Sequence, residues 1–398
     1  MTFSAPQDGY PQAVRALIAA TLLLLLSAQP AFAIGWDGEA KLSSAETLRP
    51  ELVRTGASAA LAAWVTGSSF VARRTTDGGT TWLPAQTLST SLSLGASVAA
   101  SGQNVNAVFA KRVRCPASGA FVSRIYHRRS VDGGGTWGAP VALTSSCSEA
   151  IQPDVARSSD GQVSVVWTGL TTGRILIRTS RDGGVTFAPA IAFASTTIVI
   201  SDTSAPAATY SADPQVAIGS SGTTYAAYAS APDTLSIRRS RDRGTTWSAP
   251  TRLTADAIAP NMSLVATGAR AIVGYTVDAG SLFRGVYRTT ADRGATWSAA
   301  KSVVSVPSGQ FSTDPIFAYQ AGVLAVIFKF GPPGSSPVSF RESADFGATW
   351  SARTRVSVAH SSPTDPGPGG IAILDTRTLA GYNENGDVTG LWVRRGEP

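Results

Sequence analysis

The sequence is poor in the residues that usually bind metals or act as nucleophiles. It contains two histidines and two cysteines among 398 residues. Two thiols cannot hold a zinc cluster, and neither histidine has a serine or cysteine nearby that suggests a catalytic triad. We therefore expect no metal ion and no cofactor. His127 is expected to be structural, whereas His360 lies in a predicted loop with Asp365.

Long apolar runs are missing after the first 33 residues. Arg15 precedes an apolar run over residues 16–26, and residues 31–33 read Ala-Phe-Ala, which is typical of an export cleavage site. We expect a signal peptide over residues 1–33, cleaved near Ala33, and a mature chain over residues 34–398 that is secreted to the extracellular space or the cell envelope. No second apolar stretch of about 20 residues follows, so no membrane span is expected in the mature chain.

Clustered charge is also missing, because charged residues make up 15% of the chain and the net charge of +7 is scattered. No run of five basic residues occurs. Nucleic-acid binding needs a concentrated basic patch along the phosphate backbone, so we do not expect it here.

One pattern recurs six times: Ser or Thr, any residue, Asp, any residue, Gly, any residue, Thr, aromatic. Its aspartates, for which we expect a structural role, are Asp77, Asp132, Asp182, Asp242, Asp292 and Asp345. Their separations of 55, 50, 60, 50 and 53 residues suit four short strands and their turns. The pattern predicts a tight hairpin in which Asp accepts backbone hydrogen bonds and Gly adopts a positive φ. An arginine stands four residues before every box aspartate, and we expect it to pair with a backbone carbonyl or a neighbouring carboxylate.

The two ends of the mature chain decide the number of repeats. Residues 36–42 reproduce the strand that follows each box, and residues 391–395 reproduce the strand that precedes one. The N-terminal strand therefore completes the last repeat and leaves no open sheet edge. The predicted fold is all-β: a seven-bladed β-propeller of four-stranded antiparallel blades, closed by the N-terminal strand.

The repeats resemble the Asp-box, or bacterial neuraminidase, repeats of the sialidase superfamily, along essentially the whole mature chain. That resemblance implies an arginine cluster, an acidic Asp and a Tyr nucleophile assisted by Glu. Here the family's Arg-Ile-Pro is replaced by Arg49-Pro50, a one-residue shift that is expected to turn Arg49 to the other face of its strand. The turn over residues 66–69, where the family carries its acid, has no carboxylate, and Tyr382 with Glu384 is expected to be ordinary strand packing. We therefore assign no catalytic residue.

The loops between blades and the turns between second and third strands are expected on one face, where propellers generally bind ligands near the channel. The polar residues expected there are Arg49, Glu51, Gln152, Asp154, Asp213, Gln215, Asn261, Asp314 and Asp365. Such acids also cap turns beside proline. They are candidates for a carbohydrate or cation site.

Cys115 and Cys147 are both expected in loops of the second blade on that same face, so we predict a disulfide between them. The function we expect is non-catalytic binding of a glycan or an extracellular protein by a monomer. The alternative is a sialidase-like exo-glycosidase with a divergent active site, and a structural part in an envelope assembly is a third reading.

Overall fold

The computed structural model describes residues 34–170, 172–196, 212–280, 282–358, 367–384 and 390–397, without the side chains of residues 37, 258–261 and 367–368. The predicted signal peptide, His360 and Asp365 lie outside the described residues, as does the side chain of Asn261. Regular structure within this part is entirely β-strand. No described segment forms a helix that is long and apolar enough to cross a membrane.

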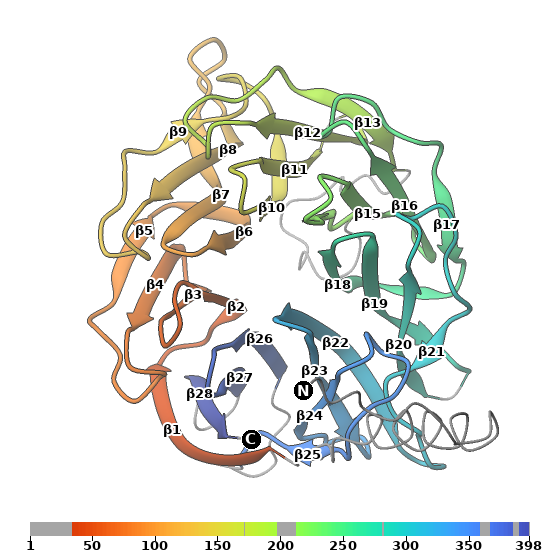
Figure 1. Cartoon of the computed structure of the whole chain (residues 1–398). Coiled ribbons are helices and arrows are strands. Elements are labelled where there is room, and N and C mark those ends of the chain that lie inside the picture. Colours follow the sequence, from red (N-terminus) through yellow and green to blue (C-terminus); the bar gives the residue numbers. More distant parts are fainter. Residues whose placement is uncertain are drawn as a thin grey trace, which may run out of the picture. The chain divides into compact units, whose positions relative to one another are not determined.

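Seven antiparallel sheets of four strands are arranged in a ring (Figure 1). Each sheet is a blade whose first strand is innermost and whose fourth strand lies at the rim. Blades 1 to 3 comprise β2 (Leu48–Arg54), β3 (Ala60–Thr66), β4 (Ser69–Thr75), β5 (Gln86–Ser89); β6 (Leu92–Ser101), β7 (Asn104–Arg114), β8 (Phe121–Ser130), β9 (Val141–Ala142); and β10 (Ala150–Arg157), β11 (Val163–Gly169), β12 (Arg174–Ser180), β13 (Ile191–Ser195). The predicted seven-bladed propeller is confirmed.

The remaining strands complete the ring. Blades 4 to 7 comprise β14 (Gln215–Ile218), β15 (Thr224–Ala231), β16 (Thr234–Ser240), β17 (Thr251–Thr254); β18 (Ala257–Thr267), β19 (Arg270–Asp278), β20 (Phe283–Thr290), β21 (Lys301–Ser302); β22 (Phe311–Gln320), β23 (Val323–Gly331), β24 (Val338–Ser343), β25 (Thr354–Arg355); and β26 (Gly367–Ile373), β27 (Thr378–Glu384), β28 (Gly390–Glu397), β1 (Gly35–Ser43). The N-terminal β1 pairs with β28, with Ala40 opposite Val393. Closure therefore joins the two ends of the described chain in blade 7, as the sequence predicts.

The aspartate of each box is hydrogen-bonded within its own hairpin. In blade 2, Asp132 accepts the Thr136 N–H at 2.9 Å and the Ser130 hydroxyl at 2.7 Å, while Ser130 Oγ accepts the Gly134 N–H at 2.9 Å. These donors lower the pKa of Asp132 to about 2. The other five boxes repeat the bond from the threonine N–H to the aspartate. The six aspartates thus have the same structural role in six blades, which is to hold the hairpin turn.

Two consecutive positive φ angles make each box turn, one more than the sequence suggested. Gly134 has φ +86°, and a Cβ there would approach Leu61 Cδ1 to 2.7 Å. The residue between Asp and this glycine is also left-handed. It is glycine in the first three boxes, but Arg243, Arg293 and Phe346 in the last three, with φ of 61°, 58° and 60°.

The repeated arginines hold neighbouring blades together through backbone carbonyls, one of the two predicted pairings. Arg128 in β8 donates to the carbonyls of Gly138 at 2.8 Å and Trp137 at 3.3 Å, after its own box, and to that of Leu88 in blade 1 at 3.0 Å. A hydrogen bond to a backbone carbonyl of the preceding blade is also donated by Arg73, Arg178, Arg341 and Arg394.

Seven apolar clusters fill the spaces between adjacent blades. Each contains the aromatic residue of one box, or Trp36 in the blade that β1 completes. Trp137, for example, packs between blades 1 and 2. The core is therefore a ring of equivalent interfaces, and no single blade dominates it.

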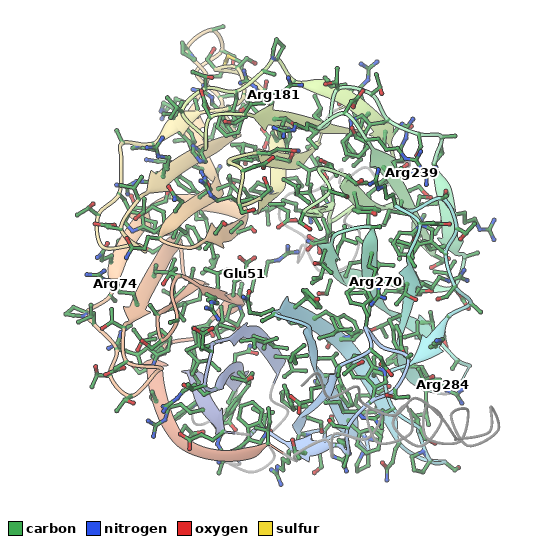
Figure 2. The ribbon with its side chains drawn as sticks, in the orientation of Figure 1. Glu51, Arg74, Arg181, Arg239, Arg270 and Arg284 are labelled. Atoms are coloured by element: carbon green, nitrogen blue, oxygen red, sulfur yellow. A yellow bond between two sulfur atoms is a disulfide. The ribbon has the colours of Figure 1, made fainter. Side chains whose placement is uncertain are left out.

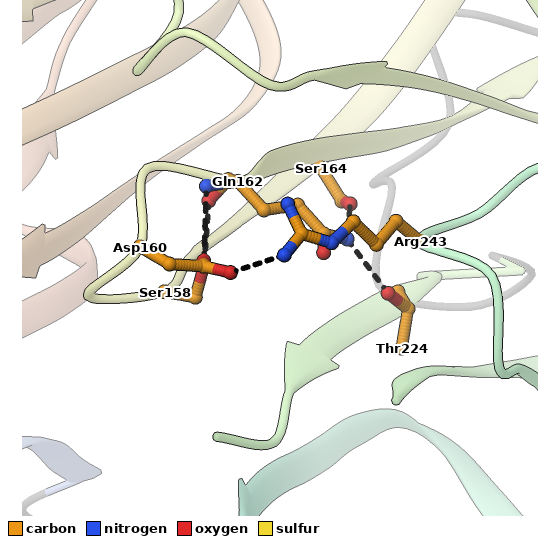
Figure 3. Close-up of polar contacts among 6 residues, drawn as sticks. All are labelled: Ser158, Asp160, Gln162, Ser164, Thr224 and Arg243. Carbon is orange, nitrogen blue, oxygen red and sulfur yellow. Dashed lines mark hydrogen bonds and ion pairs between the residues drawn. The ribbon is translucent and has the colours of Figure 1, made fainter. Parts of the chain in front are cut away.

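Polar contacts add to the interface between blades 3 and 4 (Figure 3). Buried Gln162 donates from Nε2 to the hydroxyl of Thr224 at 2.8 Å and to that of Ser164 at 3.3 Å. Nearby, Arg243 forms an exposed ion pair with Asp160 at 2.7 Å. Ion pairs of this kind contribute little to stability, so the buried amide is the stronger of the two links.

Cys115, between β7 and β8, forms the predicted disulfide with Cys147, between β9 and β10. The two Cα atoms are 4.7 Å apart, and the cysteines are separated by 32 positions. The bond ties the turn of the long β7–β8 hairpin to the segment that leads into blade 3.

Candidate binding site at the channel mouth

A cavity of about 600 Å³ lies at the centre of the ring and is lined mainly by the innermost strands. Figure 2 places Glu51 beside the central opening. Of the residues predicted at the channel mouth, the lining includes Arg49, Glu51, Asp154, Asp213, Gln215 and Asp314. Gln152 is buried instead, with 3% of its surface exposed. Sequence reasoning missed the lining residues Ser97, Ser263 and Asn383, which have no repeated motif to mark them.

Left-handed backbone positions occur near the start of four innermost strands, and three of the four residues at these positions line the cavity. Four residues that precede a proline have positive φ, namely Arg49, Gln152, Asp213 and Asp314. In blade 1 the pairing register shifts between Leu48 and Glu51, so Arg49 sits in the irregular segment. The expected turn of Arg49 to the other strand face was therefore wrong, because the bulge redirects the side chain into the cavity. Non-glycine residues with positive φ are strained and concentrate at functional sites.

An ion pair crosses the channel from blade 1 to blade 4. Arg49 Nη1 lies 2.6 Å from Asp213 Oδ1, and the two side chains are 39% and 6% exposed. Asp213 raises the pKa of Arg49. Because Asp213 offsets the positive charge of this guanidinium, its attraction for the carboxylate of a ligand is reduced.

Glu51 and Asp154 join neighbouring blades through their carboxyl groups. Glu51 Oε2 accepts the Val98 N–H of blade 2 at 2.6 Å. Asp154 accepts the Val216 N–H of blade 4 at 2.7 Å and the Ser97 hydroxyl of blade 2 at 2.7 Å. Both carboxyls are thus hydrogen-bonded to the walls of the cavity that they line.

Burial raises the pKa of both groups. Desolvation, reinforced by Asp154, raises the pKa of Glu51 to about 8. Desolvation also raises the pKa of Asp154 to about 6, against the effect of its hydrogen bonds. At neutral pH, Glu51 is mostly protonated and can donate a hydrogen bond, whereas Asp154 is mostly ionised.

The charge of the cavity is unbalanced. Arg49 is the one cationic side chain among its described lining residues, against the carboxyl groups of Glu51, Asp154, Asp213 and Asp314. No three metal-binding side chains gather as a metal site among the described residues. The lining therefore offers hydrogen-bond donors and acceptors but little attraction for an anion.

Tyr382 lies away from the cavity lining, fully buried in blade 7. Its hydroxyl donates to Glu39 of the N-terminal strand and accepts the Val358 N–H at 3.2 Å. Burial and the bond to Glu39 raise the pKa of Tyr382, which makes a phenolate nucleophile harder to form. The reading of Tyr382 as strand packing is confirmed.

Comparison with known proteins identifies a matching repeat family and several structures with a similar fold. Residues 57–254 match a family described as "BNR repeat-like domain". An ulvan lyase of polysaccharide lyase family PL25 has a similar structure, with a TM-score of 0.60, 10% identity, and coverage of 89% of this chain and 95% of that one. A Dyadobacter fermentans protein of unknown function also has a similar structure. Its TM-score is 0.51 at 14% sequence identity, and the match covers 90% of this chain and 99% of that one. No curated protein matches in sequence.

A sialidase from Trypanosoma rangeli has a TM-score of 0.47 and 15% identity, over 78% of this chain and 56% of that one. At these identities the structural likenesses establish the fold alone.

Proposed function

We propose that this β-propeller, whose repeats resemble the Asp-box repeats of the sialidase superfamily, binds a carbohydrate at its channel-mouth cavity, outside the cytoplasm, without cleaving it. The observation that carries the proposal is the way in which the cavity's charged groups are already engaged. Arg49 is paired with Asp213, and the carboxyls of Glu51 and Asp154 accept hydrogen bonds from neighbouring blades.

The lining favours an uncharged saccharide over sialic acid. One paired guanidinium against four carboxyl groups gives a carboxylate ligand no net electrostatic attraction. Hydroxyl groups of a neutral sugar can donate to the ionised carboxylates and accept from protonated Glu51. The volume of about 600 Å³ is within the usual range for small-ligand sites.

The disulfide supports a location outside the reducing cytoplasm, where such bonds persist. A secreted monomer remains part of the proposal, with an extracellular protein as the alternative ligand. Sedimentation of the exported protein tests whether it is a monomer. Its mass after export tests whether the signal peptide is removed.

A glycan array probed with the labelled protein tests the proposed ligand class. We expect neutral oligosaccharides to be retained and sialylated ones not. The side-chain amide of Gln215 lines the cavity and has no hydrogen-bond partner among the described residues, so Gln215→Ala removes a contact to the ligand with little effect on the fold. Loss of that bond should weaken binding about fivefold to tenfold.

The matched control is Gln103→Ala, an exposed glutamine between β6 and β7, on the box side of the ring. It should leave affinity unchanged. Equal weakening by both variants, or retention of sialylated glycans alone, would contradict the proposed site.

One observation favours an enzyme as the second candidate. Glu51, with a pKa near 8, lies beside Asp154, with a pKa near 6, and carboxyls with separated pKa values often serve as acid and base in glycoside cleavage. Release of a chromophore from aryl glycosides, abolished by Glu51→Gln while saccharide binding persists, would establish this candidate and refute the binding module.

A further inference from the structure

The second and third strands of blade 2 extend beyond those of the other blades. β7 has 11 residues and β8 has 10, whereas the corresponding strands of blade 3, β11 and β12, have seven each. The hairpin therefore projects from the face that carries the channel mouth. Its turn is held by the Cys115–Cys147 disulfide.

Strand alternation shows which side chains this projection leaves uncovered. Lower in the hairpin, Val108 and Ala110 of β7 and Ile125 of β8 pack against blade 3. Side chains two residues apart share a sheet face, so Arg112 and Arg114 continue that face in β7. Phe121, the cross-strand partner of Arg114, continues it in β8. This face of the hairpin packs against blade 3 near Val108 and Ile125, but it is exposed to solvent near the turn, at Arg112, Arg114 and Phe121.

These three side chains form a cationic aromatic platform. The Phe121 ring is 51% exposed, and the guanidinium carbons of Arg112 and Arg114 lie 4.9 and 4.6 Å from its centroid. Both arginines are exposed. Two guanidiniums above one ring repel each other, and an anion bound between them would relieve that repulsion.

Arg112 and Phe121 of this platform line a pocket of about 390 Å³ between blades 2 and 3, and Arg114 flanks it through its contact with the Phe121 ring. Leu92, Ile151 and Leu170 supply apolar lining. Glu149 also lines the pocket, and one of its carboxylate oxygens accepts the Ser123 N–H of β8 at 3.1 Å. The hydroxyl of Ser93, also in the lining, has no hydrogen-bond partner among the described residues.

The disulfide joins two segments that flank this pocket. Cys115 immediately follows Arg114, and Cys147 lies two residues before Glu149. Arg114 Nη1 also donates to the carbonyl of Gly119 within the turn, at 2.9 Å. A site held in this way loses little conformational entropy when a ligand binds.

We propose that this pocket is a second saccharide site, separate from the channel mouth, and that it binds an anionic sugar unit carrying a carboxylate or a sulfate. The exposed phenyl ring stacks on the apolar face of the sugar, while Arg112 and Arg114 bind the anionic group. The two arginines outweigh Glu149, which can accept a hydrogen bond from a sugar hydroxyl. The proposal does not depend on ligand binding in the channel.

Titration calorimetry of the full chain at low salt tests the site with four defined probes. Maltohexaose is the neutral probe, sulfated maltohexaose and hexagalacturonate carry the two kinds of anion, and hexaglutamate is an anionic peptide. We expect at least one anionic saccharide to bind at least about tenfold more tightly than maltohexaose, and added salt to weaken it. The preferred probe distinguishes sulfate from carboxylate.

Phe121→Ala should weaken this binding about tenfold, and Arg112→Ala with Arg114→Ala should weaken it further. The matched control is Phe283→Ala with Arg284→Ala, an exposed pair at the same turn of blade 5, which should leave affinity within about twofold. Gln215→Ala, in the channel, should also have no effect, so the two proposals fail separately.

Equal weakening of maltohexaose and of the anionic saccharides by Phe121→Ala would overturn the proposal, because the pocket would then not select for the anionic group. So would equal or tighter binding of hexaglutamate, since that would make the pocket a peptide site. Unaltered anion binding by the thermally stable Phe121→Ala protein would show that the anion binds elsewhere.

Discussion

Replacing Glu51 with glutamine removes the most perturbed carboxyl group in the channel while keeping an oxygen that can accept the Val98 N–H. Burial holds the pKa of Glu51 near 8 in the folded chain, against 4.5 for an ordinary glutamate. The folded state therefore holds this proton more tightly than the unfolded state does. The resulting stability is complete below about pH 4.5 and is lost as the pH rises through 8.

The size of the effect follows from the two pKa values. Between pH 6.5 and 9 the folded carboxyl releases nearly all of its proton, whereas the unfolded one has already lost it. At 1.36 kcal/mol per pKa unit, the free energy of unfolding should fall by about 2 kcal/mol across this window. The same titration of Asp154, near pH 6, is largely complete before the window begins.

Urea unfolding followed by tryptophan fluorescence, at pH 6.5 and at pH 9, measures this difference. Glu51→Gln should reduce the fall by about 2 kcal/mol, because its side chain does not titrate. Glu46→Gln makes the same chemical change at an exposed position five residues earlier and should retain the full fall. If wild type and Glu51→Gln have the same pH dependence, burial does not perturb Glu51 and the reasoning is refuted.

Three further predictions concern the scaffold. Asp132→Asn should destabilise the protein by about 1–2 kcal/mol at pH 7, because it weakens the hydrogen bonds of the box. It should also reduce the loss of stability between about pH 4 and 2, where the unfolded Asp132 and then the folded one take up a proton. Thermal unfolding across this pH range measures both effects, with the exposed Asp233→Asn as the control. Arg293→Gly should stabilise by about 0.5–1 kcal/mol, because φ of +58° suits glycine, whereas Arg241→Gly in a neighbouring box, without a positive φ, should destabilise in the same assay. Replacing both Cys115 and Cys147 with serine should cost about 4 kcal/mol for a closed loop of 32 positions; an unchanged melting temperature would contradict this expectation.

The fold was predictable because its determinants are local and repeated. The box places Ser130, Asp132, Gly134 and Thr136 in one hairpin, so eight consecutive residues contain the whole hydrogen-bond pattern. Matching the terminal strands to that repeat was enough to predict closure through β1. The disulfide followed from the same map, since both cysteines fell in loops of one blade on one face.

The geometry of the channel was less predictable because it depends on contacts between distant residues. Arg49 and Asp213 are 164 residues apart, and their pairing requires the closed ring. The bulge that turns Arg49 inward has a sequence cue, a proline at the same point of several blades. That cue does not reveal the positive φ, since residues before proline usually adopt extended conformations.

Comparison between blades shows that the scaffold does not require the channel carboxyls. Glu51 and Asp154 each follow the proline of an innermost strand, where blade 6 has Ile316. Ile316 packs in the apolar cluster between blades 6 and 7, so this position can be filled without a carboxyl group. The raised pKa values show that burying Glu51 and Asp154 disfavours their charged forms, a cost that Ile316 avoids. This comparison supports the proposed role of Glu51 and Asp154 in ligand binding, beyond the hydrogen bonds by which they join neighbouring blades.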